Sequence, residues 1–310
     1  MTAHVCTLFE GAYHHGVAAL TNSLCAHGYR GIVWAGYRGG LPDWAVSATW
    51  HESFAEFAAT PECTIRFVLV DTERHLTNYK PEFMRSLWNG RCTQADALFY
   101  FDPDITIRCR WSYFEEWITS GVALCEDINS PVPLTHPLRA QWQKIYRRHG
   151  VDLRFSASQY VNGGFLGVVS EHRAFLDDWC KAQEIMEAEI GGLHQIAVDL
   201  GGRDHPFGKT DQDALNIAMG MSETPHSIIG KEGMNLIPGG FTMAHTLGYP
   251  KGWDTGFAVH AMRGHPPSSS VKAYFEHVDH PIRIFSPYDA LIRKADLRLG
   301  ALIGRFYRRN

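Results

Sequence analysis

Short apolar segments alternate along the chain with longer segments in which apolar residues recur every three or four positions. The short runs predict strands at residues 5–9, 32–35, 65–70, 97–101, 122–125 and 165–169. The longer segments predict helices at residues 16–27, 81–88, 111–120, 136–149, 171–189 and 211–219. Strands that alternate with helices predict an α/β fold with a mostly parallel central sheet flanked by helices.

Residues 97–101 form a continuous apolar run that is followed directly by Asp102-Pro103-Asp104. Apolar residues resume at residue 105. An uninterrupted apolar pattern is typical of a strand that is covered on both faces, so the two aspartates lie at its carboxyl end. Ligands bind at that edge of an open α/β sheet, and Pro103 cannot donate to a sheet ladder. Two carboxylates there favour Mg²⁺ or Mn²⁺ with a bound diphosphate. Taken alone, the same three residues also fit an ordinary turn.

The remainder of the chain indicates two parts. Residues 191–209 predict a long surface loop, and residues 266–270 predict a linker. We therefore expect a catalytic domain at residues 1–267 and a C-terminal extension at residues 268–310. The extension ends in a basic amphipathic helix at residues 291–310, with Leu291, Ala295, Leu299, Leu302 and Phe306 along one face. Such a helix binds an anionic membrane surface or packs its apolar face on the domain.

Composition narrows the class of protein. The formal net charge is −4, which gives no indication of a nucleic-acid partner. The seven cysteines are dispersed, as expected in a reducing compartment. The sequence starts without a signal-peptide pattern and contains no apolar run of membrane-spanning length. These features predict a cytoplasmic protein, with peripheral attachment at the inner face of the membrane if the last helix binds lipid. They leave the oligomeric state open.

Three further motifs bear on the metal site. His260 ends a short apolar run, and an imidazole suits Mn²⁺ better than Mg²⁺, although one histidine among 17 is more often structural. Asn162-Gly163-Gly164 offers a side-chain amide on a backbone that approaches a ligand closely, or forms a simple turn. Asp211-Gln212-Asp213 opens a helix, where Asp211 is also a possible cap.

The order of these motifs resembles nucleotide-sugar glycosyltransferases of the GT-A fold, which is Rossmann-like, and most closely glycosyltransferase family 8, which transfers galactose or glucose. The resemblance covers residues 5–267. It rests on a tyrosine in the first turn, an Asp-x-Asp, an Asn-x-Gly before a strand, an Asp-Gln-Asp that opens a helix, and a late His-x-x-Gly. Here these are Tyr13, Asp102-Pro103-Asp104, Asn162-Gly163-Gly164, Asp211-Gln212-Asp213 and His260-Ala261-Met262-Arg263-Gly264.

The resemblance implies a site for Mn²⁺ or Mg²⁺ and a nucleotide sugar. It makes Asp102, Asp104 and His260 the metal ligands. It places Gln212, Asp211 and Asn162 at the sugar as the catalytic group. The donor-binding positions that it implies are Phe9, Glu10, Tyr13, Lys80, Asp102, Gly163 and Gly264, with Tyr13 stacked on the base and Lys80 near the diphosphate.

The sequence departs from the family at two points. Glu10 and Gly11 occupy the loop where members carry an acidic residue that reads uracil, so uridine is the expected base. His265 and Pro266 follow Gly264 in place of the family's Lys-Pro, so His265 and Arg263 are the candidates for the phosphate contact of that lysine. Gln212 stands where a catalytic nucleophile would be expected near the anomeric carbon. A side-chain amide at this position fits a transfer that retains the anomeric configuration.

We therefore expect a metal-dependent transferase that moves a hexose from a nucleotide diphosphate sugar to a glycan or lipid-linked saccharide, in polysaccharide biosynthesis. Residues 194–209, Trp253 and Phe257 are candidates for the acceptor site. Two alternatives remain from the residues alone. Asp102 and Asp104 also fit the first motif of haloacid-dehalogenase-type phosphatases, with Asp102 as the nucleophile. A non-catalytic protein that binds nucleotide sugars or glycans is the other.

Overall fold

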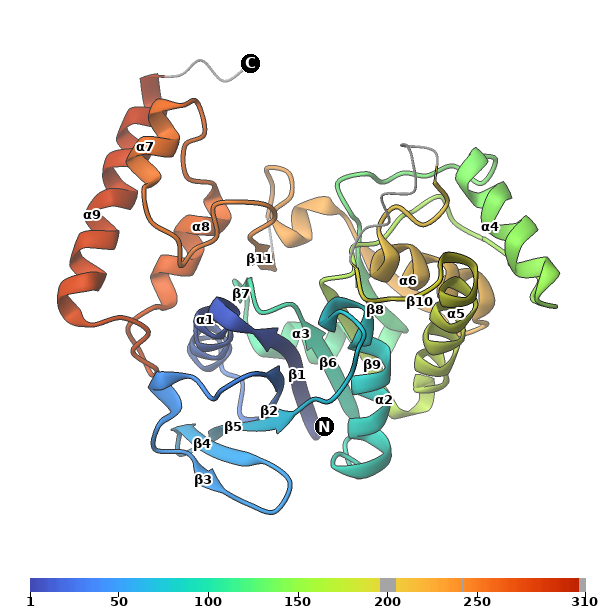
Figure 1. The fold of residues 1–310 in the computed structure, drawn as a ribbon, viewed down its shortest axis with the longest axis horizontal. Helices are drawn as coiled ribbons and strands as arrows, with labels where there is room; N and C mark the ends of the chain where they lie inside the picture. The colour runs from blue at the N-terminus through green and yellow to red at the C-terminus, as the bar shows by residue number, and fades with distance from the viewer. Residues whose placement is uncertain (196–204, 241, 307–310) are drawn as a thin grey trace. The chain divides into compact units, whose positions relative to one another are not determined.

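The computed structural model describes residues 1–195, 205–240 and 242–306, and the chain forms two compact units (Figure 1). The first unit contains residues 1–8, 70–101 and 112–231, and the second contains residues 9–69, 102–111 and 232–310. The fold is α/β, with mostly parallel strands flanked by helices, as the sequence predicts. The proposed domain boundary at residue 267 remains a prediction.

In the first unit the strand order is β10-β8-β9-β6-β1. Strand β6 runs parallel to β1, and β10 runs parallel to β8, whereas β9 is antiparallel to both β6 and β8. The direction of β9 breaks the expected parallel pattern, because a buried strand shows the same apolar run in either direction. The strands are β1 (Ala3–Glu10), β6 (Ala97–Phe101), β8 (Val122–Cys125), β9 (Phe165–Val169) and β10 (His226–Ile229).

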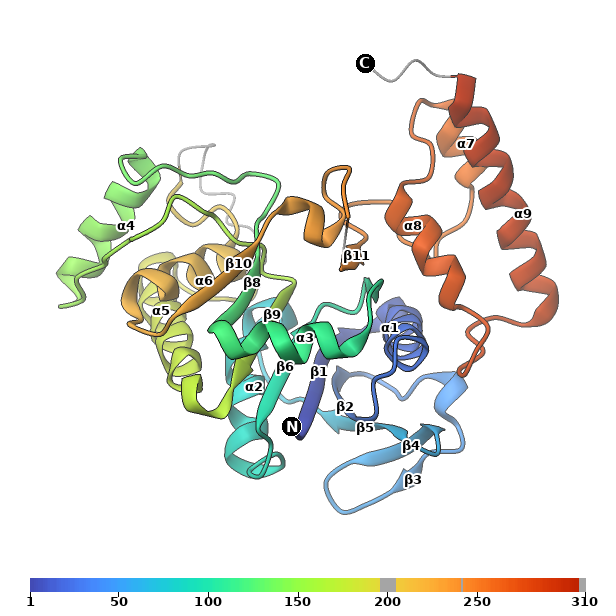
Figure 2. The ribbon, with the colours of Figure 1, turned by 180° about the vertical axis from the view of Figure 1, so that it is seen from behind.

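Helices in the same unit follow the predicted segments to within a few residues. They are α2 (Lys80–Gly90), α3 (Trp111–Trp117), α4 (Pro137–Arg148), α5 (Ala174–Ile190) and α6 (Thr210–Met221). Helix α5 packs against α6 and α2 (Figures 1 and 2). All five residues of β6 are buried, and the Phe114 ring of α3 lies 5.6 Å from the Phe101 ring. The predicted buried strand before Asp102 is therefore confirmed.

The second unit has the strand order β2-β5-β4-β3 and a separate two-stranded pair of β7 and β11. The strands are β2 (Gly31–Arg38), β3 (Thr49–Trp50), β4 (Ala55–Thr60), β5 (Cys63–Leu69), β7 (Ile105–Ile107) and β11 (Met243–His245). Helix α1 (His14–Ala26) ends before Gly28, whose φ of +91° favours glycine, so the predicted helix stop is confirmed. The antiparallel β3 and β4 are additional to the predicted strands.

Three helices follow in the second unit, namely α7 (Phe257–Met262), α8 (Ser269–Tyr274) and α9 (Pro287–Ile303). The predicted linker at residues 266–270 is wrong in part, because the Ser268 side chain accepts from Val271 N and starts α8. Helices α7 and α9 run side by side (Figures 1 and 2). The Asp296 carboxylate of α9 accepts the backbone N–H groups of Gly256, Phe257 and Ala258 at the start of α7. This contact fixes the last helix to its neighbour.

Candidate functional site

Asp102 and Asp104 follow directly after β6, at the carboxyl end of the strand as the sequence predicts. The amide of Ile105 donates to the Asp102 carbonyl oxygen at 3.0 Å, which closes a tight turn around Pro103. Asp104 is buried and Asp102 is partly exposed. Strand β7 begins at Ile105, immediately after the turn, so the second carboxylate is held between two regular elements.

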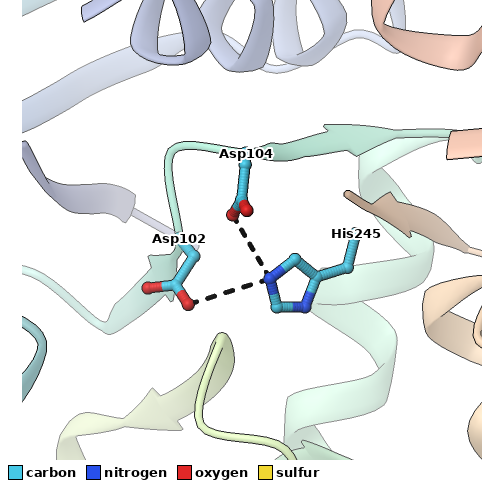
Figure 3. Close-up of side chains that lie close together, drawn as sticks. All are labelled: Asp102, Asp104 and His245. Atoms are coloured by element: carbon cyan, nitrogen blue, oxygen red, sulfur yellow. Dashed lines mark ion pairs between the residues drawn. The ribbon is translucent and has the colours of Figure 1, made fainter. Parts of the chain in front are cut away.

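A histidine far away in the sequence lies against these carboxylates (Figure 3). Strand β11 pairs antiparallel with β7, which puts His245 opposite Ile105, and the Thr246 amide donates to the Asp104 carbonyl oxygen at 3.0 Å. The Nε2 atom of His245 lies 3.2 Å from Oδ1 of Asp104 and 3.9 Å from Oδ2 of Asp102. The short β7–β11 ladder therefore brings the three side chains together.

The donor set of this cluster fits a divalent cation. One ligand atom from each of Asp102, Asp104 and His245 lies within 4.8 Å of the others. Two carboxylate oxygens suit Mg²⁺ or Mn²⁺, and the imidazole nitrogen suits Mn²⁺ better. Two carboxylates held this close repel one another unless a cation offsets their charge. The cluster is thus a candidate metal site.

Lys251 is a further cation at this cluster. Its Nζ atom lies 2.5 Å from Oδ2 of Asp104 and 2.7 Å from the Thr246 carbonyl oxygen. Burial alone raises the pKa of Asp104, but the His245 and Lys251 side chains outweigh it and lower that pKa below its ordinary value. Burial alone lowers the pKa of Lys251, and Asp104 reverses this and raises it. Both charges are therefore retained at neutral pH.

Tyr13 lies close to the same lysine. Nζ of Lys251 is 5.8 Å from the centre of the Tyr13 ring, and that ring lies edge-on to Trp253 at 5.0 Å. Tyr13 is 39% exposed, which leaves part of its face free for a ligand. Trp253 and Phe257, the aromatic candidates for an acceptor site, are both buried.

The other predicted residues of the second unit lie in different surroundings. Phe9 is buried and stacks on Tyr37 at 5.9 Å, and the Glu10 carboxylate pairs with Arg38 at 2.9 Å. Gly264 follows the end of α7 with a φ of +90°. His260 lies within α7, with its ring edge-on to Tyr249 at 5.3 Å, and is outside the group of metal-ligating side chains in the part of the chain that the structure describes.

The sequence contains a second His-x-x-Gly, which precedes the motif at His260. His245-Thr246-Leu247-Gly248 has the same spacing as the motif at His260, and Lys251 follows it closely. Lys251-Gly252 begins three residues after Gly248. A lysine soon after the glycine distinguishes the motif at His245 from the motif at His260 in the sequence.

A second group of predicted residues surrounds Lys80 in the first unit. Lys80 begins α2 and is buried, and its Nζ donates to the Gly163 carbonyl oxygen at 2.9 Å. The same ammonium lies 3.0 Å from Oδ2 of Asp211 and 5.3 Å from the centre of the Tyr100 ring. The side chain of Asp211 thus pairs with Lys80, and the residue that caps α6 is Lys209. The structure brings Lys80, Gly163 and Asp211 together.

Gln212 and Asn162 extend this buried group. Oε1 of Gln212 accepts the Gly163 amide at 3.3 Å, whereas its Nε2 is buried without a hydrogen-bond partner among the described residues. A Cβ at Gly163 would lie 2.7 Å from Oδ2 of Asp211, so only glycine fits there. Nδ2 of Asn162 donates to Asp127 at 2.7 Å, and its Oδ1 accepts the Gly164 amide at 2.9 Å.

Asp127 is a member of this group that the sequence did not single out. It lies two residues after β8, and it is buried. Burial raises its pKa, but hydrogen bonds from Asn129 and Asn162 outweigh that and lower it. Asp127 comes just after a predicted strand, as Asp102 does. This pattern in the sequence could have identified Asp127 as a candidate site residue.

Asp213 and Tyr160 form the last polar pair of the first unit. The Tyr160 hydroxyl donates to Oδ1 of Asp213 at 2.6 Å, and the Lys209 amide donates to Oδ2 at 2.8 Å. Burial raises the pKa of Asp213 to about 7.

Tyr160, Lys209 and Asp213 line a cavity of about 740 Å³. The remainder of its wall is formed by Asn129, Val132, His136, Pro137, Leu138, Gln141, His205 and Gly208. Residues 196–204 of the predicted loop at residues 191–209 lie outside the described residues.

Comparison with known proteins identifies the fold. No family model and no curated protein matches the sequence. A solved apo structure of the bifunctional glycosyltransferase WbbM matches 96% of this chain and 52% of its own, with a TM-score of 0.58 and 14% identical residues. The chain therefore spans about half the length of that protein.

Among the described residues, no helix has the length and apolar character needed to cross a membrane.

The similarity to WbbM shows the fold alone: this chain has the fold of a glycosyltransferase, with an Asp-Asp-His cluster compatible with a metal ion.

Proposed function

We propose that the protein is a metal-dependent glycosyltransferase of family 8 type, which moves a hexose from a uridine diphosphate sugar to a saccharide acceptor. The observation that carries this proposal is the cluster of Asp102, Asp104 and His245 on a glycosyltransferase fold. The Asp-x-Asp motif at the end of a buried strand and the His-x-x-Gly motif that β11 brings to it both support the assignment.

Charge is the main requirement of this reaction. Breaking the bond between the anomeric carbon and the diphosphate leaves negative charge on the departing group. Asp102, Asp104 and His245 would hold Mn²⁺ or Mg²⁺, and a bound divalent ion stabilises the charge of the diphosphate. The Lys251 ammonium lies beside the same carboxylates, and we assign it to a phosphate oxygen of the bound donor. Tyr13 offers a partly exposed ring for stacking on the base.

The buried group of the first unit suits the recognition of sugar hydroxyls. Asp211 accepts from Lys80, and Nε2 of Gln212 is a buried donor, so both kinds of hydrogen-bonding group are present. We assign Asp211, Gln212 and Asn162 to the transferred sugar, and Lys80 to the orientation of Asp211. The Gln212 amide is not a nucleophile, and we infer a retaining reaction in which the departing phosphate accepts the acceptor's proton.

The cavity beside Asp213 is our candidate for the saccharide acceptor. Its volume of about 740 Å³ lies in the range of sites that bind small organic ligands. The Tyr160 hydroxyl, the Asn129 amide and the Lys209 ammonium provide hydrogen-bonding groups, and Val132 and Leu138 provide apolar contact. A glycan or a lipid-linked saccharide presents both kinds of surface.

The last helix supports attachment to an anionic membrane surface. The predicted apolar face of α9 is its exposed face, with Leu291 66% and Leu299 51% exposed, while the face toward α7 buries Leu297 and Gly300. Arg298 and Arg305 are exposed beside that apolar face. An apolar stripe flanked by arginines fits the interface of a bilayer that contains anionic lipid.

Two other functions make different predictions at the same residues. A phosphatase that uses Asp102 as a nucleophile forms a phosphoaspartate there, and trapping it would replace our proposal. A protein that binds a nucleotide sugar without turnover has a donor affinity that depends on metal, but releases no nucleotide.

The test is nucleotide release from a panel of nucleotide sugars in the presence of Mn²⁺ or EDTA. We expect one donor to be hydrolysed slowly without an acceptor, only with metal, and the anomeric configuration of the first-formed sugar to be retained. Donor binding without release from any sugar nucleotide would favour the binding protein.

A further inference from the structure

Arg139 carries a buried charge without a counter-ion. It lies on α4 and is 3% exposed, and its Nη2 donates to the Gln159 carbonyl oxygen at 2.9 Å. Its guanidinium stacks over the Phe155 ring at 4.5 Å, and its Nε has no hydrogen-bond partner in the described part of the chain. No described carboxylate pairs with it. Because arginine stays charged at neutral pH, a guanidinium buried in this way is costly unless an anion joins it.

A cavity of about 430 Å³ opens beside this arginine, wholly within the first unit. It is bounded by residues 154–159, by the end of α6 and by the start of β10. The wall also contains Nε2 of His226, a second buried atom that has no hydrogen-bond partner among residues 1–195, 205–240 and 242–306. The other polar residues of the wall are Arg154, Ser156, Gln159, Asn216, Ser222, Glu223 and Thr224.

The charges and hydroxyls of this wall are suited to an anion. Arg139 and Arg154 contribute two positive charges, against one carboxylate from Glu223, which is exposed. The Arg154 side chain is 85% exposed and its guanidinium makes a long contact of 3.8 Å with Asp152, so it can turn toward a ligand. Ser156 offers a hydroxyl donor. Charge-assisted hydrogen bonds from arginine to an oxyanion are stronger than those between neutral groups.

We propose that this cavity is a binding site for the phosphate or carboxylate group of a small organic molecule, with Arg139 as its buried anchor and Arg154 at its mouth. The volume fits a ligand of about monosaccharide size. The site is separate from the Asp102, Asp104 and His245 cluster and does not depend on the glycosyltransferase proposal.

The test is a calorimetric titration of the full chain in EDTA, at constant ionic strength, with three probes. Inorganic phosphate and glucuronate represent the two oxyanions, and glucose is the neutral control. The variants are Arg139→Gln, Arg154→Gln and, as a matched control, Arg147→Gln, which alters an exposed arginine of the same helix. EDTA removes any divalent ion that would hold phosphate at the aspartates.

We expect saturable binding of phosphate or glucuronate and none of glucose. Loss of a charged hydrogen-bond donor should weaken the affinity at least about tenfold in Arg139→Gln and Arg154→Gln, and leave Arg147→Gln unchanged. If Arg139→Gln does not fold, Arg154→Gln decides the question. The proposal is overturned if neither oxyanion binds the wild type, if glucose binds equally well, or if Arg154→Gln binds like the wild type. None of these results bears on nucleotide release.

Discussion

Nε2 of His245 lies 3.2 Å from Oδ1 of Asp104, although 140 residues separate the two in the sequence (Figure 3). The antiparallel pairing of β7 with β11 produces this contact. The same pairing leaves His260 on α7, outside the cluster. The identity of the histidine ligand is therefore directly testable.

His245→Ala should lose an imidazole ligand and weaken Mn²⁺ binding by more than about tenfold. His260→Ala is the matched control and should bind Mn²⁺ like the wild type. Electron paramagnetic resonance of free Mn²⁺ measures both affinities. A loss of affinity in His260→Ala with normal binding in His245→Ala would restore the ligand set expected from the sequence.

Lys251→Met should weaken binding of a nucleoside diphosphate while Mn²⁺ still binds. The substitution removes an ammonium that contacts Asp104 and that we assign to a phosphate oxygen. Loss of one charged hydrogen bond predicts an affinity about tenfold lower or more. Calorimetry in saturating Mn²⁺ measures it, with the exposed Lys272→Met as the control. Equal affinities in the two variants would rule out a phosphate contact by Lys251.

Asp213 should make stability fall as the pH rises toward neutrality. Its folded pKa is about 7, against an ordinary value of 3.8, because burial disfavours the carboxylate. Between these values the unfolded chain has lost the proton that the folded chain keeps, so the free energy of unfolding decreases with pH.

Asp213→Asn removes this penalty while keeping an oxygen for the Tyr160 hydroxyl. The variant should gain stability relative to the wild type from pH 4 to pH 7, on the order of a few kcal/mol, and the gain should level off above pH 7. Urea unfolding at several pH values measures the difference. A difference that does not vary with pH would show that Asp213 titrates normally.

The exposed face of α9 should bind vesicles that contain phosphatidylglycerol but not vesicles of phosphatidylcholine alone. Arg298→Glu with Arg305→Glu should abolish flotation with the vesicles, because anionic lipid then repels the helix. The matched control is the charge reversal of two exposed lysines elsewhere, Lys144→Glu with Lys272→Glu. Failure of the wild type to float, or association of the chain into a dimer through α9, would contradict the membrane assignment.

Local pattern was sufficient to predict most elements and both aspartates of the Asp-x-Asp motif. The five buried residues of β6 follow from their apolar run, and the start of α2 follows from Pro81 in its first turn. The direction of β9 did not follow, because side-chain pattern reports burial and not which way a strand runs. The two residues of β3 are too few for a periodic signal, and β4 (Ala55–Thr60) contains one large apolar residue, Phe57.

The candidate site was less predictable, because long-range pairing assembles it. Two histidines begin a His-x-x-Gly, and only the ladder between β7 and β11 shows that His245 meets Asp104. Lys80 was expected near a diphosphate, and its pairing with Asp211 depends on residues 131 positions apart. Asp127 could have been found from its position after β8, whereas its contact with Asn162 could not.

The most direct test of a metal-dependent transferase is nucleotide release from the preferred sugar nucleotide by the wild type and by Asp104→Asn, each with Mn²⁺ and with EDTA. Asp71→Asn, at an exposed aspartate outside the cluster, is the control. We predict metal-dependent release by the wild type and by Asp71→Asn, and at least about a hundredfold slower release by Asp104→Asn, since the diphosphate then loses its stabilising charge. Release that persists in EDTA, or in Asp104→Asn at the wild-type rate, would contradict the proposed function.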